Sequence, residues 1–209
     1  EQLTELLVAM EEGAVLKGVR ESLASGKAPH AILDALSEGM NVVGERYGAK
    51  EYFLADLVMA AEIFKQSMEI LEPELAAEGT DREVCGRMVI GTAEGDLHDI
   101  GKNIFVALAR NAGFSVTDLG IDVAPEVLVE HVKREKAHVL GISGILTFSL
   151  DSMRATVKLL EEQGIRDQVK VIIGGLPVDE RWRELVGADA FSDDAYAGLH
   201  KVLALMEGE

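Results

Sequence analysis

The segment that surrounds His98 carries the residues with the clearest capacity for chemistry. Asp96 precedes His98 by two positions, and Gly95 and Gly101 flank the pair. A carboxylate that accepts the Nδ1 proton of an imidazole fixes its tautomer, raises the basicity of the ring and leaves Nε2 to bind a metal ion. Glycines make such a turn pliable. The segment therefore predicts a metal ligand that comes with its own orienting group.

The same segment matches a phosphate-binding loop poorly. Five residues rather than four separate Gly95 from Gly101, and Asn103 stands where a triphosphate-binding loop needs Ser or Thr. The acidic side chains of the segment would repel phosphate oxygens, and the chain has no Gly-x-Gly-x-x-Gly motif for a dinucleotide. Nucleotide binding is therefore not expected here.

Two kinds of metal site could use this imidazole. A two-metal hydrolase would bind its metals through Asp96, His98 and Asp99, and it would need further His and Asp ligands after other strands. The segments 143–149 and 174–177 offer hydroxyls and glycines instead. A metal held by one protein nitrogen must bring its other ligands with it, which favours a macrocycle.

Small and hydroxyl-bearing residues in those two segments suit a long polar tail on such a ligand. Gly174 and Gly175 have no side chain that would block a tail laid against a sheet. Ser143, Thr147 and Ser149 can form hydrogen bonds with it. We therefore expect the tail to enter beside these two segments.

The second part of the chain must form the scaffold for these loops. Short apolar runs predict five strands, at Met88–Gly91, Ser115–Leu119, Val139–Ser143, Val169–Ile173 and Ala190–Phe191. Amphipathic stretches predict the helices that alternate with them, at Ile100–Asn111, Pro125–Lys136, Leu150–Gln163, Glu180–Val186 and Ala195–Met206. The alternation predicts an α/β fold with a flavodoxin-like (Rossmann-like) five-stranded parallel sheet of order 2-1-3-4-5. Ligands of such sheets bind at the carboxyl ends of the strands, where the three loops would converge.

The first part of the chain shows helical spacing of its apolar residues, with no long alternation of period two. The expected helices are one marked by Leu6, Met10 and Ala14, a continuation or second helix marked by Val15, Val19 and Leu23, one from Pro29 to Gly44 or Gly48, and one from Tyr52 to Leu71 that Pro73 stops. Together they predict a small antiparallel bundle. Because the pattern changes after a polar stretch at 74–83, we expect a helical domain at 1–82 and an α/β domain at 83–209.

Composition excludes several classes of function. The chain has 209 residues, 48% of them hydrophobic and 27% charged, with a formal net charge of -17. This acidity opposes the binding of nucleic acid, so we expect no nucleic-acid partner. No apolar run could span a bilayer, and the first residues do not resemble a signal peptide, so we expect no membrane partner and a cytoplasmic location. The single cysteine, Cys85, permits no intrachain disulfide, which agrees with a reducing compartment.

The loop residues also resemble a known signature. Asp96-x-His98-x-x-Gly101, Ser143-x-Ile145 and Gly174-Gly175, in this order and at these strand ends, resemble the signature of cobalamin-binding domains of the methyltransferase type. The likeness extends over 96–104, 141–147 and 174–178. In the helical part, residues 51–61 resemble the cap domain of the same family, so the likeness covers nearly the whole chain. Ile145 replaces a usual Leu, and Ala55 replaces a proline that many relatives have.

This resemblance implies a cofactor and roles for particular residues. The cofactor would be cobalamin, with methylcobalamin as the working form, bound base-off and histidine-on. His98 would bind the cobalt, Asp96 would hold the Nδ1 proton and Ser149 would hold Asp96, and these three would carry the catalytic role. The implied cofactor contacts are Gly95, Asp96, Leu97, His98, Asp99, Ile100, Gly101, Ser143, Ile145, Leu146, Thr147, Ser149, Gly174 and Gly175. Phe53, Leu57 and Ala60 of the helical part would face the upper side of the cofactor.

The implied function is that of a corrinoid methyl carrier, a subunit that depends on partner proteins. One partner would be a substrate-specific methyltransferase and another a methyltransferase that uses tetrahydrofolate, coenzyme M or a similar acceptor. A reductive activase would restore oxidised cobalt. The alternatives are a cobalamin-dependent sensor, an adenosylcobalamin isomerase subunit, or a plain flavodoxin-like domain without cobalamin. The methyl donor stays open, as does the oligomeric state, a homo-oligomer included.

Overall fold

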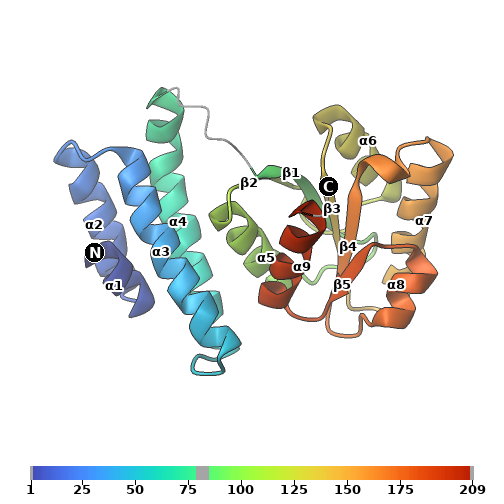
Figure 1. Cartoon of the computed structure of the whole chain (residues 1–209), viewed down its shortest axis with the longest axis horizontal. Coiled ribbons are helices and arrows are strands. Elements are labelled where there is room, and N and C mark those ends of the chain that lie inside the picture. The colour runs from blue at the N-terminus through green and yellow to red at the C-terminus, as the bar shows by residue number, and fades with distance from the viewer. Residues whose placement is uncertain (1, 79–84, 208–209) are drawn as a thin grey trace. The chain divides into compact units, whose positions relative to one another are not determined.

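The computed structural model describes residues 2–78 and 85–207, which fall into two compact units. The units are Glu1–Glu83, here called the helical unit, and Val84–Glu209, here called the sheet unit. The boundary expected between residues 82 and 83 lies outside the described residues. Figure 1 shows the elements of both units.

The helical unit is an antiparallel arrangement of helices joined by short turns (Figure 1). Its helices are α1 (Gln2–Val8), α2 (Glu12–Ala24), α3 (Pro29–Gly48) and α4 (Leu54–Glu78). Pro29 is the first residue of α3, where its fixed φ suits a helix start and its missing N–H costs no hydrogen bond. Along α3 the apolar stripe of Ile32, Leu36, Met40 and Val43 is fully buried. The predicted bundle is thus held together by one apolar face of each long helix.

The expected first helix through Met10 and Ala14 is wrong. The helix α1 ends at Val8, because Met10 adopts a left-handed backbone with φ of 58°. The amide of Glu11 donates to the carbonyl of Leu6 at 3.0 Å, which is the backbone pattern of a Schellman ending. The apolar spacing continues across this break, so periodicity alone could not reveal it.

The expected end of the long helix at Pro73 is also wrong. Helix α4 continues through Pro73 to Glu78. A proline inside a helix removes one backbone hydrogen bond and crowds the preceding turn. The residues that follow it, Glu74 and Leu75 among them, are strong helix formers. Their propensity and the packing of the helix outweigh the lost bond.

The sheet unit confirms the predicted α/β fold. Its parallel strands are β1 (Gly86–Thr92), β2 (Phe114–Asp118), β3 (Val139–Ser143), β4 (Lys170–Gly174) and β5 (Ala190–Ser192), in the order β2-β1-β3-β4-β5. The helices between and after them are α5 (Ile100–Asn111), α6 (Pro125–Glu135), α7 (Ser149–Glu162), α8 (Glu180–Val186) and α9 (Ala195–Glu207), with a short 3-10 turn at Arg166–Gln168. The predicted bounds of β3, α5 and α8 match the structure, and the others differ by only a few residues.

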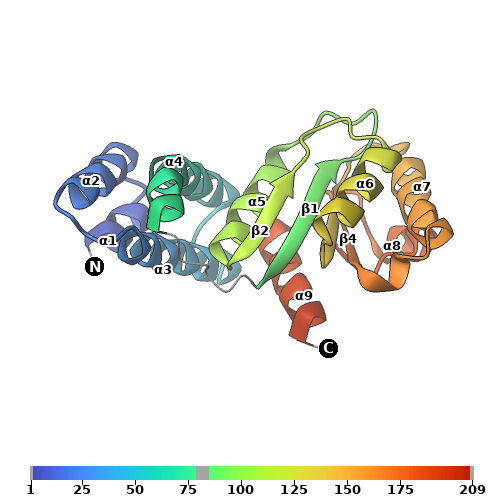
Figure 2. The ribbon, with the colours of Figure 1, turned by 90° about the horizontal axis from the view of Figure 1, so that it is seen from above.

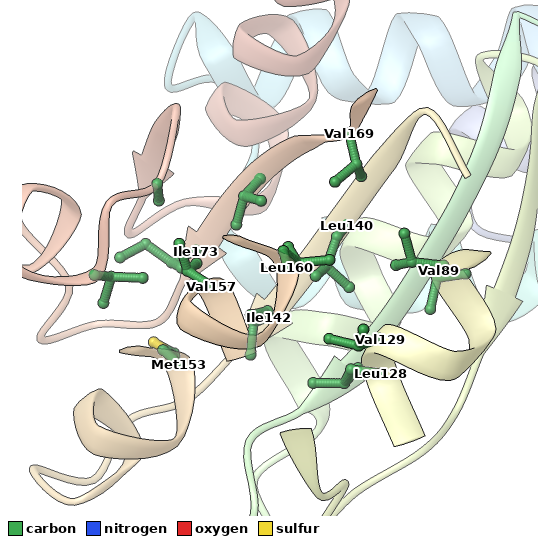
Figure 3. Close-up of a cluster of buried hydrophobic side chains, with 14 of the residues drawn as sticks. Val89, Leu128, Val129, Leu140, Ile142, Met153, Val157, Leu160, Val169 and Ile173 are labelled. Atoms are coloured by element: carbon green, nitrogen blue, oxygen red, sulfur yellow. The ribbon is translucent and has the colours of Figure 1, made fainter. Parts of the chain in front are cut away.

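Helices cover both faces of the sheet (Figure 2). Helices α5 and α9 pack together on one face, and α6, α7 and α8 cover the other. Figure 3 shows the apolar cluster of the second face, where Val89, Leu140 and Ile142 of the sheet meet Leu128 of α6 and Leu160 of α7. Because both faces are covered, the inner strands β1, β3 and β4 are mostly apolar and buried, whereas the edge strand β2 is partly exposed. This core fixes the strands whose ends carry the loops.

None of the helices in the part of the chain that the structure describes has both the length and the apolar character needed to cross a membrane.

Candidate functional site

The three predicted loops begin side by side at the carboxyl edge of the sheet. Thr92, the last residue of β1, is in register with Ser143, the last residue of β3. Ser143 is in register with Gly174, the last residue of β4. The amide of Ala93 also donates to the carbonyl of Ser143 at 2.8 Å. The strands therefore deliver their loops to one place, next to the point where the strand order reverses.

The carboxylate of Asp96 is the centre of this site. Its Oδ1 accepts the amide of His98 at 3.0 Å and lies 2.7 Å from the Nδ1 of His98. Its Oδ2 accepts the hydroxyl of Ser149 at 2.8 Å and the amides of Ile145 and Leu146 at 2.8 and 3.2 Å. The side chain of Asp96 has no exposed surface. One buried carboxylate thus joins the loop after β1 to the loop after β3.

These contacts determine the charge of Asp96. Burial acts to raise its pKa, but the hydrogen bonds from His98, Ile145 and Ser149 outweigh burial and bring the pKa of Asp96 well below the usual range of an aspartate. The carboxylate is therefore ionised at neutral pH. An ionised acceptor beside Nδ1 selects the imidazole tautomer with its proton on that nitrogen.

The other nitrogen of His98 is accessible. The side chain of His98 is 55% exposed, and among the described residues no hydrogen bond is made to its Nε2. With Nδ1 protonated, Nε2 carries a lone pair and can bind a metal ion. The structure therefore brings Asp96 and His98 together as their spacing predicts, and Ser149 joins them as the family resemblance implies. Their roles toward a cofactor stay predictions at this point.

The two glycines after β4 differ in what they require. Gly175 has φ of 142°, and a Cβ on it would lie 2.1 Å from the carbonyl oxygen of Gly144. A Cβ on Gly174 would meet only the carbonyl of Ser192, at an ordinary contact of 3.5 Å. Gly175 is therefore needed for the close approach of two loops, a reason that the sequence analysis missed. At Gly174 the local backbone does not require glycine, and the absence of a side chain leaves space there.

The hydroxyls expected to bind a polar tail also differ. The hydroxyl of Ser149 donates its hydrogen bond to the carboxylate of Asp96. Thr147 is exposed and Ser143 is half-buried, next to Gly174. Ser143 and Thr147 therefore keep the predicted role for a tail, whereas Ser149 belongs to the Asp96 network.

Other predicted contact residues line the loop after β1. Gly95 adopts φ of 80°, and the space where a Cβ of Gly101 would lie is open. Asp99 accepts the side-chain amide of Asn103 at 3.0 Å. This bond ties the end of the loop to the first turn of α5.

Large apolar side chains are exposed at the same edge of the sheet. We call this set the apolar rim; its members are Leu97, Ile100, Ile121, Phe148 and Leu176, with exposed fractions from 42% to 82%. They come from the loops that follow β1, β2, β3 and β4, Ile100 as the first residue of α5. Large exposed apolar side chains gathered in neighbouring loops indicate a binding surface. Sequence analysis named only Leu97 and Ile100, although apolar residues in the other loops were a signal for the rest.

In the helical unit the predicted contact residues separate into two kinds. Phe53, just before α4, is 75% exposed, whereas Leu57 and Ala60 are fully buried. Leu54, Val58 and Met59 are exposed apolar residues of the same end of α4. The amide of Phe53 donates to the carboxylate of Asp56 at 2.7 Å, which fixes the start of the helix.

Fold and site together define a class of protein. A doubly wound domain presents one carboxylate-held imidazole within an apolar rim, in a chain that also contains a helical bundle. Across residues 2–78 and 85–207, no group of three or more His, Cys, Asp or Glu side chains is placed to hold a metal ion.

Comparison with known proteins specifies this class. A family model described as a B12 binding domain matches residues 86–200, and a second model with the same description matches residues 1–72. Dimethylamine corrinoid protein 1 of Methanosarcina mazei is 35% identical over 209 residues, which are 100% of this chain and 96% of that protein. The chain therefore belongs to the family of B12-binding corrinoid proteins, and its cofactor is cobalamin.

Two solved structures support the assignment. A cobalamin-binding protein from Desulfitobacterium hafniense DCB-2 is 41% identical, with a TM-score of 0.71 over 98% of this chain and 97% of its own. A chain of the methanol:cobalamin methyltransferase complex from Methanosarcina barkeri is 29% identical, with a TM-score of 0.84 over 99% of this chain and 79% of its own.

The residues of the site fit this cofactor. A corrin brings most of its own cobalt ligands, and His98 would hold the metal through one oriented nitrogen. The apolar rim suits the broad face of a corrin ring. Gly174 leaves space beside the hydroxyls of the neighbouring loop.

Proposed function

We propose that this chain is the methyl-carrier subunit of a cobalamin-dependent methyltransferase system. It would carry a methyl group from a substrate-specific methyltransferase to a second methyltransferase that uses tetrahydrofolate, coenzyme M or a similar acceptor. The single observation that carries the proposal is the imidazole of His98, held at 2.7 Å by a buried, ionised Asp96. The names of the relatives, a dimethylamine corrinoid protein and a methanol:cobalamin methyltransferase complex, support it.

Each residue of the network has a defined task in this proposal. His98 would hold the cobalt through Nε2, as the proposed base-off, histidine-on binding requires. Asp96 holds the proton at Nδ1, which keeps the ring in the tautomer that can bind. Ser149 and the amides of Ile145 and Leu146 keep the carboxylate ionised. When bound, cobalamin supplies the cobalt–carbon bond that stores the methyl group.

The helical unit would cover the upper side of the cofactor. Among the predicted cap residues only Phe53 is exposed, and it lies with Leu54, Val58 and Met59 at one end of α4. An apolar cover excludes water from a reactive metal centre. We therefore assign the cover to these four residues, with Leu57 and Ala60 supporting them from inside the helical unit.

Transfer also needs other proteins. The chain holds a cofactor network and a helical bundle, and the two family models together span most of it. The proposed partners are the two methyltransferases and a reductive activase, with dimethylamine or methanol representing the substrates suggested by the relatives. The single cysteine, Cys85, allows no intrachain disulfide, which supports the proposed cytoplasmic location.

The axial nitrogen can be tested directly by electron paramagnetic resonance. The protein reconstituted with cob(II)alamin should show nitrogen splitting of the cobalt lines, in a triplet pattern from ¹⁴N. Labelling only histidine with ¹⁵N should change the triplets to doublets, because the nuclear spin of the ligand changes. In His98→Ala, ¹⁵N labelling of histidine should no longer change the splitting. The control, His131→Ala, should still show the change from triplets to doublets. Triplets that survive histidine labelling would mean that the cofactor keeps its own base, against the proposal.

A further inference from the structure

The loop between β2 and α6 grips the loop that carries His98. The amide of Gly95 donates to the Oδ1 of Asp122 at 2.6 Å. In the opposite direction, the amide of Asp122 donates to the carbonyl of Asp96 at 3.1 Å. Asp122 therefore holds the two-residue segment Gly95–Asp96 at both ends, through the N–H of Gly95 and the carbonyl of Asp96. We call this pair of bonds the clasp.

The backbone of Asp122 shows that the clasp is a specific feature. Asp122 adopts φ of 53°, a left-handed conformation that is uncommon outside glycine. Aspartate and asparagine tolerate this region best among residues with a side chain. Glycine would adopt it more easily but would offer no acceptor to the amide of Gly95. The position thus combines a strained backbone with the side-chain oxygen that accepts the amide of Gly95.

The loop that carries Asp122 is itself fixed on both sides. The amide of Thr92 donates to the carbonyl of Gly120, and the amide of Val123 donates to the carbonyl of Thr92, both at 2.9 Å. The amide of Gly120 also donates to Asp118 at 2.9 Å. The carboxylate of Asp118 accepts the Nζ of Lys102, whose side chain is 2% exposed, at 2.7 and 2.6 Å. The clasp therefore rests on a rigid support.

We infer that Asp122 is a positioning residue for the cobalt ligand, acting through the Gly95–Asp96 step. This inference rests on the proposed role of His98. The clasp sets where the backbone of Asp96 lies, and so whether its carboxylate can reach the loop after β3 and the Nδ1 of His98 together. Loosening the clasp should allow the imidazole to leave its position while the fold persists.

Three substitutions separate the acceptor from the backbone. Asp122→Gly keeps the left-handed backbone and removes the acceptor, whereas Asp122→Asn keeps both. Lys136→Gly is a matched control, because Lys136 is left-handed too, with φ of 49°, but ends α6 outside the clasp.

The first measurement uses the protein without cofactor. Hydrogen–deuterium exchange of the segment 94–98 should accelerate roughly ten- to hundredfold in Asp122→Gly, the change expected for loss of a hydrogen bond to a charged group. Asp122→Asn and Lys136→Gly should exchange at nearly the wild-type rate. Unchanged exchange in Asp122→Gly would overturn the clasp.

The second measurement records the nitrogen splitting of cob(II)alamin in the same variants. In Asp122→Gly, a smaller fraction of the bound cob(II)alamin should show splitting from histidine nitrogen. In Asp122→Asn, this fraction should be close to that of the wild type. If hydrogen exchange is faster in Asp122→Gly but the fraction of cob(II)alamin with histidine splitting is unchanged, the positioning role is overturned and the proposed function is not affected. A wild-type protein without histidine splitting would overturn the proposed function itself, and the exchange data would still decide whether the clasp exists.

Discussion

At the scale of single residues, the site is organised by hydrogen bonds to one buried carboxylate. Asp96 receives donors from its own loop and from the loop after β3, and this concentration of donors outweighs the cost of its burial. A carboxylate solvated so completely by the protein is a fixed negative charge. It gives His98 one tautomer and one orientation.

The depressed pKa of Asp96 predicts how stability depends on pH. Its pKa is lower in the folded chain than the ordinary value of 3.8, so the contribution to stability is complete above that value and is lost as the pH falls below it. Asp96→Asn has no such contribution. The difference in free energy of unfolding between wild type and Asp96→Asn should be constant from pH 7 to about 5 and should shrink below about pH 4. Urea unfolding at several pH values measures it.

Asp151→Asn is a suitable control, because Asp151 is an exposed aspartate outside the Asp96 network. Its difference from wild type should stay flat over the same pH range. A flat difference for Asp96→Asn down to pH 3 would contradict the assignment of Asp96 as the ionised centre of the network.

Sequence predicted the side chains of this network but not the groups around them. The spacing of Asp96 and His98 is a local pattern, so it can be read directly. The amides of Ile145 and Leu146 leave no trace in residue type, because every residue except proline has one. Asp122 was missed because its tie to Gly95 depends on the pairing of β1 with β2 rather than on any short spacing.

At the scale of elements, strand ends that lie level with one another create the site. Buried parallel strands appear in the sequence as continuous apolar runs, so the strand order and the place of the loops could be predicted. The break at Met10 and the continuation through Pro73 could not, because neither is visible in the apolar spacing that predicts the helices. The close approach of the loops after β3 and β4 at Gly175 also appears only in three dimensions.

The two neighbouring glycines after β4 give a matched test of that approach. Gly175→Ala should lower the free energy of unfolding by about 3 kcal/mol, because the new Cβ meets a backbone carbonyl at a positive φ. Gly174→Ala should change it by less than about 1 kcal/mol. Gly174→Ala should nevertheless weaken cobalamin binding if the tail passes beside it. Urea unfolding and cofactor titration by absorbance measure the two effects.

Equal destabilisation by both substitutions would show that the strand end as a whole, rather than the Gly144–Gly175 contact, sets the requirement for glycine. Undiminished cobalamin binding by Gly174→Ala would remove this residue from the path of the tail.

At the scale of the whole molecule, the chain combines two units with different tasks. The apolar cluster on the α6, α7 and α8 face belongs entirely to the sheet unit. The dimethylamine corrinoid protein matches this chain over 100% of its length, so both units belong to the family architecture. In the proposed function, holding the cofactor and covering it would fall to separate compact units.

Separate cores predict that the sheet unit folds without the helical unit. Trp182 is the single tryptophan of the chain and packs against the apolar cluster of the sheet unit, so its fluorescence reports that unit. A fragment of residues 84–209 should unfold in urea with the same fluorescence midpoint as the intact chain. Leu57→Ala, which empties a buried position of the helical unit, should leave that midpoint unchanged. A fragment without a cooperative transition would contradict the prediction.

The left-handed backbone of Asp122 also restricts what evolution can place there. A β-branched or bulky residue would oppose that conformation, and a glycine would abandon the amide of Gly95. Only aspartate and asparagine meet both demands. A homologue that keeps the Asp-x-His pair but carries valine at this place must have rebuilt the turn, and its corrin chemistry should be inferred from its own geometry rather than borrowed from this chain.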